Sequence, residues 1–125
     1  MHAQRPVNLG LSTIVQQPLP AIVSITHRIT GILIFFGMGF FFWLLDRALA
    51  SPESLEQTKV AMAAPSAKLS MLVVLAALAF HVVAGIRHLL LDVHIGDTLK
   101  AGRASAGATF AIAGLVVLLA VYWLW

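Results

Sequence analysis

The chain has no cysteine and few acidic residues. Because none of its 125 residues is cysteine, this chain cannot form disulfides, thiolate metal sites or cysteine-ligated iron–sulfur clusters, though a partner could. Only five residues are Asp or Glu, and charged residues of both signs make up 10% of the sequence. No acidic residue lies in the interior of a long apolar run, so a carboxylate-based proton or ion path has little support.

Apolar residues are abundant instead. They make up 60% of the chain, more than a soluble domain carries. Three segments reach the roughly 20 residues needed to cross the hydrocarbon layer of a bilayer: about 29–49, 69–91 and 106–125. Hydrocarbon offers backbone polar groups no other partners, so each segment is expected to be helical. We therefore predict an all-α integral membrane protein, with residues 1–125 forming one anchor domain of three transmembrane helices.

The two connections between these segments are short. In the first, from Ala50 to Lys68, Ser51-Pro52-Glu53 signals a helix end and restart, and we expect a polar loop with about one helical turn. The second connection extends from Asp92 to Ser105. Three helices bury little surface against one another, so a partner subunit is also expected.

The distribution of basic residues predicts the orientation in the membrane. Arg5, Arg28, Arg87, Lys100 and Arg103 lie before the first span or around the second connection, and Arg47, Lys59 and Lys68 lie on the other side. By the positive-inside rule, the N-terminal segment 1–28 is cytoplasmic or interfacial and the C-terminus is periplasmic. Because the N-terminus lacks the character of an organellar transit peptide, a bacterial inner membrane is the expected location.

Polar residues cluster at one end of the first two spans. They are Ser24, His27 and Arg28 at the start of the first span, and His81, Arg87 and His88 late in the second. The first helix runs outward and the second inward, so both groups are expected in the same leaflet and facing one another. Ionisable groups near hydrocarbon are costly, which marks this end as a functional site.

His81 has three interpretations. His81, Gly85 and His88 are spaced i, i+4 and i+7 on one helical stripe with Ala77 and Ala84. The small residues can form a helix-packing face on which His81 makes an interhelical hydrogen bond. Alternatively, they leave room for a flat macrocycle, and His81 Nε2 ligates haem iron. A proton relay is the third interpretation.

The other polar residues also have alternatives. Arg87 and His88 either form a basic helix end that sets orientation or, if a haem is present, pair with its propionates. Ser24 and Arg28, four residues apart, either form a helix cap with an interfacial arginine or present two donors to a quinone carbonyl. In the second case, Ile25 covers the quinone ring.

Three motifs resemble the cytochrome b subunit family of succinate dehydrogenase. They are Arg5-Pro6-Val7-Asn8-Leu9, the S-x-x-H-R-x-x-G pattern from Ser24 to Gly31, and the H-x-x-x-G-x-R-H-x-x-x-D pattern from His81 to Asp92. They occur in the expected order on the expected helices, and the similarity spans nearly the whole chain. The resemblance implies an anchor subunit of succinate–quinone oxidoreductase, respiratory complex II, without activity of its own.

The resemblance also implies partners and cofactors. A second small membrane anchor, an iron–sulfur subunit and a flavoprotein would complete the complex, with FAD and the iron–sulfur clusters confined to those partners. Succinate would be oxidised in the flavoprotein, and electrons would reach a quinone, expected to be ubiquinone, at the membrane, with haem b nearby. The alternatives are an anchor of a related fumarate reductase and a haem-free structural anchor.

Residue by residue, the resemblance implies the following roles. His81 matches the haem axial ligand, and the second axial ligand would come from the other anchor. Ser24 and Arg28 match quinone-site residues, with Ile25 beside them. His27 and Arg28 would lie near the haem propionates, where His88 is a further candidate. No residue of this chain is expected to be catalytic.

Overall fold

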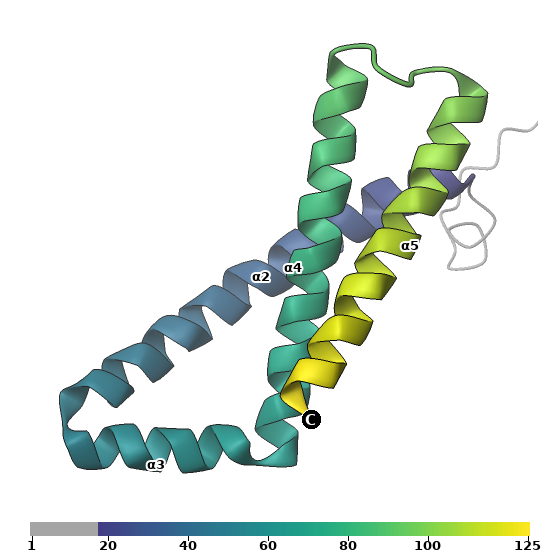
Figure 1. The fold of residues 1–125 in the computed structure, drawn as a ribbon. Coiled ribbons are helices and arrows are strands. Elements are labelled where there is room, and N and C mark those ends of the chain that lie inside the picture. The colour runs from purple at the N-terminus through teal and green to yellow at the C-terminus, as the bar shows by residue number, and fades with distance from the viewer. Residues whose placement is uncertain (1–17) are drawn as a thin grey trace, which may run out of the picture.

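Four helices make up the part of the chain that the computed structural model describes, residues 18–125. They are α2 (Leu19–Ala50), α3 (Pro52–Ala63), α4 (Pro65–Asp92) and α5 (Leu99–Leu124), as Figure 1 shows. By length and composition, α2, α4 and α5 can each cross a membrane. The all-α membrane fold with three spans is therefore confirmed. The motif at positions 5–9 lies outside the described residues.

All three spanning helices begin earlier than their apolar cores, α2 and α5 by the most. α2 starts at Leu19, with Pro20 in the first turn, where the fixed φ of proline suits a helix start. α5 starts at Leu99, and the Thr98 side chain caps it by accepting a hydrogen bond from the N–H of Ala101 at 3.3 Å. Ser24 to Arg28 are therefore helical, and hydropathy locates only the hydrocarbon-crossing part of each helix.

The expectation of a polar loop with one turn between the first two spans is wrong. This connection forms α3, a helix of 12 residues. Ser51 caps it by accepting a hydrogen bond from the N–H of Ser54 at 3.1 Å, and Pro52 occupies its first turn. None of its residues is buried, so no clear apolar periodicity marks the helix in the sequence. Figure 1 shows α3 crossing between the end of α2 and the start of α4.

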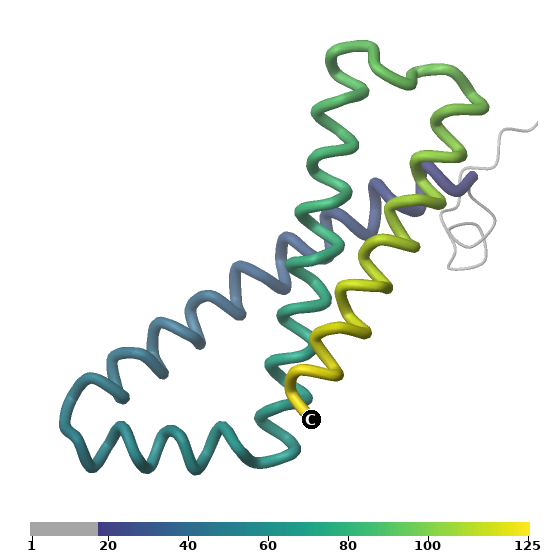
Figure 2. The backbone as a smooth tube through the Cα atoms, in the orientation of Figure 1, coloured from purple at the N-terminus to yellow at the C-terminus, as the bar shows by residue number. Residues whose placement is uncertain are grey.

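The three long helices are packed unequally. α4 and α5 lie side by side and run in opposite directions, and α2 contacts both. Figure 2 shows the first half of α2 crossing the other two helices, whereas its second half diverges from α4. A cleft of about 270 Å³ lies in the resulting wedge, lined among others by Phe40, Trp43, Met62 and Ala67.

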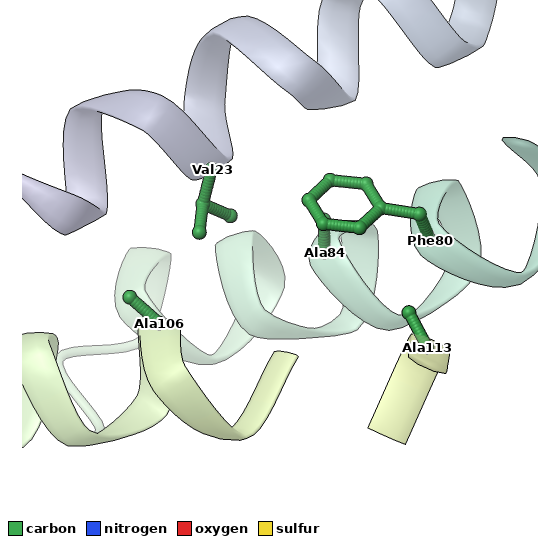
Figure 3. Packing of buried hydrophobic residues seen from close by; sticks show 5 residues of the cluster. All are labelled: Val23, Phe80, Ala84, Ala106 and Ala113. Atoms are coloured by element: carbon green, nitrogen blue, oxygen red, sulfur yellow. The ribbon is translucent and has the colours of Figure 1, made fainter. Parts of the chain in front are cut away.

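The small core lies where all three spans meet. Val23 of α2, Ala84 of α4 and Ala106 of α5 are fully buried. Figure 3 shows Val23 pointing from α2 toward the other two helices, with Phe80 and Ala113 completing the cluster. Because alanine occupies most of these positions, the helix backbones approach closely at the same end of the bundle as the polar residues.

Most of the spanning surface is left uncovered. In the most apolar windows of α2, α4 and α5, only 11%, 17% and 17% of residues are buried. On α2, for example, Phe35 and Phe36 remain 74% and 70% exposed. A multi-pass membrane protein presents such surface to lipid or to another chain, which supports the expected partner.

Candidate functional site

Three histidines meet where α2 crosses α4. The rings of His27 and His81 stack with centroids 4.0 Å apart and planes 12° apart. The ring of His88 meets His27 edge-on, with centroids 5.1 Å apart. The structure thus brings the start of the first span against the end of the second, as the topology predicted.

The Nδ1 atom of His81 lies between two oxygen atoms of α2. It is 3.0 Å from the backbone carbonyl oxygen of His27 and 3.2 Å from Oγ1 of Thr30. A carbonyl oxygen only accepts, so we assign the ring proton to Nδ1, and Nδ1–H donates to His27. In a neutral imidazole this leaves the lone pair on Nε2. Within residues 18–125, Nε2 makes no hydrogen bond.

Gly31 permits this close approach of α2 and α4. A Cβ atom at Gly31 would lie 3.1 Å from Cε1 of His81, tighter than an ordinary contact, whereas one at Gly85 would be in ordinary van der Waals contact, 3.5 Å from Nε2 of His27. Larger residues at position 31 would therefore displace the His81 ring.

The packing interpretation of the small-residue stripe on α4 is correct. Ala77 and Ala84 are buried, and His81 makes an interhelical hydrogen bond. That bond uses Nδ1, however, and metal ligation needs only Nε2. Helix packing and iron ligation are therefore compatible roles for His81.

Ser24 and Arg28 lie one turn apart on α2. Ser24 and the neighbouring Ile25 are half-buried, whereas Arg28 is exposed. The cap interpretation of Ser24 is wrong, because α2 begins at Leu19 and its N-cap is Pro18. Among the described residues, neither Ser24 nor Arg28 uses its side chain in a hydrogen bond within the chain. As far as residues 18–125 are concerned, both polar groups are thus open to a ligand.

Arg87 does not face the histidines. Its side chain is only 6% exposed, its Nε donates to Oγ of Ser105 at 3.0 Å, and its Nη2 donates to the carbonyl of Gly102 at 3.3 Å. Six residues after His81, it lies about 240° further around α4 and points to α5. The burial of Arg87 against α5 shows that the expectation of a side chain snorkelling to the interface is wrong. These contacts give no support to pairing with a haem propionate, and the role of its charge in setting orientation stays a prediction. The helical period of α4 could have predicted that Arg87 lies on a different face from His81.

The histidine cluster offers one metal ligand rather than several. In the described part of the chain, no group of three His, Asp or Glu side chains is arranged to hold a metal ion. The rings of His27 and His81 lie face to face, so they cannot direct nitrogens at one ion from opposite sides. The arrangement suits a group that takes a single axial imidazole from this chain.

Comparison with known proteins identifies similar sequences. Residues 1–121 match the family described as "Succinate dehydrogenase/Fumarate reductase transmembrane subunit". The chain is 40% identical over 126 residues to the succinate dehydrogenase cytochrome b556 subunit of Coxiella burnetii (strain RSA 493 / Nine Mile phase I), with 100% of both chains covered. It is 29% identical over 101 residues to the subunit of the same name from Rickettsia bellii (strain RML369-C), which covers 81% of this chain and 78% of that protein.

Proposed function

This chain belongs to the succinate dehydrogenase/fumarate reductase transmembrane subunit family, and from this membership we propose how its residues serve electron transfer from succinate to quinone. It is a membrane subunit of succinate dehydrogenase, and both relatives carry that name rather than that of a fumarate reductase. Succinate is oxidised in a partner subunit in this proposal. The chain itself anchors the complex and contributes to two binding sites.

The first site is for haem b, with His81 as an axial ligand. Both relatives are named as cytochrome b556 subunits. The observation that carries the assignment is the 3.0 Å contact between Nδ1 of His81 and the carbonyl of His27. Histidines that bind metals commonly donate their other N–H to a carbonyl, which fixes the tautomer and makes Nε2 a better donor. Haem supplies a one-electron carrier when bound there.

A second small membrane anchor would supply the other ligand to the haem iron. Within residues 18–125, His81 is the only histidine of the cluster whose Nδ1 is held by a carbonyl, and His27 stacks on it rather than opposing it. The largely uncovered spans provide the surface that such a partner would bury.

Haem propionates are carboxylates, and this chain places basic groups near His81. His27 stacks on His81, His88 meets His27 edge-on, and Arg28 follows His27 on an exposed face of α2. N–H donors and positive charge favour carboxylates through charge-assisted hydrogen bonds. We assign His27 and Arg28 to the vicinity of the propionates, with His88 as a further donor.

The second site is for quinone, at Ser24, Ile25 and Arg28. A quinone oxygen gains negative charge as the ring is reduced, and fixed donors stabilise that charge. Ser24 Oγ donates a hydrogen bond to one quinone oxygen, and the Arg28 guanidinium holds positive charge beside it. Ile25 supplies an apolar contact to the ring. Protons reach the quinone from the side of the membrane at which α2 begins.

The remaining partners and the orientation complete the proposal. An iron–sulfur subunit and a flavoprotein, carrying the clusters and FAD, dock on the cytoplasmic side of a bacterial inner membrane, and the quinone is ubiquinone. The second connection, with Lys100 and Arg103, faces the cytoplasm by the positive-inside rule, and the C-terminus faces the periplasm. The exposed Tyr122 and Trp123 fit an aromatic belt at the outer interface.

The complex purified through a tag on this chain tests the proposal. Haem, flavin and succinate–quinone activity should be recovered together, with one haem for each flavin. A complex that contains flavin and reduces quinone but holds no haem would instead identify a haem-free anchor.

A further inference from the structure

We propose that Thr30 and Gly31 are positioning residues that hold the His81 ring with Nε2 toward the haem iron. This inference rests on the proposed haem site and names two residues that act through His81. Thr30 is only 7% exposed, and Gly31 lies directly against the His81 ring.

Thr30 acts on the Nδ1 edge of the ring. Its Oγ1 donates to the carbonyl of His27 at 2.9 Å, a bond within its own helix that turns the hydroxyl proton away from His81. The lone pairs of Oγ1 are then available to Nδ1–H, 3.2 Å away. Because a β-branched side chain has few rotamers in a helix, the position of this oxygen is well defined. The proton on Nδ1 is therefore held by two oxygens, the carbonyl and the hydroxyl.

Gly31 acts on the neighbouring atom of the ring. A Cβ there would lie 3.1 Å from Cε1 of His81, closer than an ordinary van der Waals contact. Cε1 lies between the two ring nitrogens, so a displacement at this atom also moves Nε2. The absence of a side chain at position 31 lets the ring keep the orientation that the two oxygens define.

Three groups of α2 together fix the His81 ring. The ring of His27 covers one face at a centroid distance of 4.0 Å, the oxygens hold the Nδ1 edge, and Gly31 borders Cε1. The Nε2 edge is the one without a hydrogen-bond partner in residues 18–125. A histidine that served only helix packing would not require a free Nε2 edge.

The arrangement has an electronic consequence. A hydrogen bond accepted from Nδ1–H makes the imidazole a stronger donor through Nε2, which favours the oxidised iron. Removing the Thr30 hydroxyl weakens this effect. The haem midpoint potential should therefore rise, and the ring should lose part of its orientation.

The test compares four variants of the intact complex. Thr30→Val removes the hydroxyl at nearly constant shape, Thr30→Ser retains it, and Gly31→Ala adds a Cβ. Thr109→Val is the matched control, since Thr109 is 2% exposed and, among the described residues, its hydroxyl bonds only to the carbonyl of Ser105 within α5. The readouts are the haem-to-flavin ratio, the midpoint potential and the low-temperature electron paramagnetic resonance spectrum of the oxidised haem.

Thr30→Val should raise the midpoint potential, shift the resonance spectrum and weaken haem retention about tenfold, as loss of a supporting hydrogen bond does at metal sites. Thr30→Ser should resemble the unsubstituted complex, Gly31→Ala should lower the haem content, and Thr109→Val should change none of these. The inference is overturned if Thr30→Val leaves the potential and spectrum unchanged, or if Thr30→Ser or Thr109→Val has the same effect as Thr30→Val. Absence of haem from the unsubstituted complex would overturn the proposed function itself.

Discussion

Nδ1 of His81 lies 3.0 Å from the carbonyl oxygen of His27, and this contact joins two helices at positions 54 residues apart in the sequence. It links helix packing to cofactor chemistry, because the same bond that ties α4 to α2 leaves Nε2 without a proton. The close approach also depends on Gly31, which leaves room for the ring.

Replacement of the two donors proposed for the quinone site should separate two activities. Ser24→Ala removes one neutral hydrogen bond, worth about 1 kcal/mol, and should lower succinate–quinone turnover several-fold. Arg28→Leu removes a charged donor, worth about 1.5–3 kcal/mol, and should lower turnover by about ten- to a hundredfold. Succinate oxidation with a soluble dye should be largely retained in both variants.

Arg47→Leu is a suitable control for Arg28→Leu. Arg47 is also an exposed arginine of α2, but it lies at the opposite end, where its guanidinium sits 5.4 Å from the Trp43 ring. It should leave quinone turnover nearly unchanged. Equal loss of dye and quinone activity in the Arg28 variant would instead indicate failed assembly.

Removing the acceptor of Arg87 should weaken the protein without altering the haem. Ser105→Ala leaves Nε of Arg87 without its partner on α5 and should cost about 1–2 kcal/mol in stability. The midpoint of thermal inactivation of the complex should fall by several degrees. The haem spectrum should not change, because Arg87 points away from His81. A changed haem spectrum with unchanged thermal stability would contradict this role of Arg87.

The absence of cysteine allows a direct test of orientation. Lys59→Cys places one thiol on α3, and Lys100→Cys places one at the start of α5; both lysines are exposed. A membrane-impermeant maleimide applied to intact spheroplasts should label this chain at position 59. It should label position 100 only in inside-out vesicles. The reverse pattern would contradict the proposed orientation.

The meeting of the start of α2 with the later part of α4 could be predicted from the sequence because it depends on topology. Two successive spans must run in opposite directions, so the start of one and the end of the next share a leaflet. Hydropathy also placed the three spans. Hydropathy could not show where each helix begins, since a capping residue such as Thr98 before α5 is polar and lies outside the apolar run.

Other features depend on packing that a pattern of apolar residues does not encode. α3 was missed because it buries none of its residues. Arg87 was placed in the histidine cluster because it neighbours His88 in sequence, whereas its position around α4 directs it to Ser105. Thr30 was not identified because its role follows from a distance to His81. The sequence feature that points to Thr30 is its position three residues after His27, on the same face of α2.

The central claim, that His81 binds haem through Nε2, is tested most directly by a dithionite-reduced minus oxidised absorption spectrum. The samples are the detergent-purified complexes of the unsubstituted chain, of His81→Ala, and of His94→Ala as a control in the exposed second connection. The account predicts a b-type spectrum in the unsubstituted and His94→Ala complexes, and a lost or clearly altered spectrum in His81→Ala with flavin still present. An identical spectrum and haem content in all three complexes would contradict it.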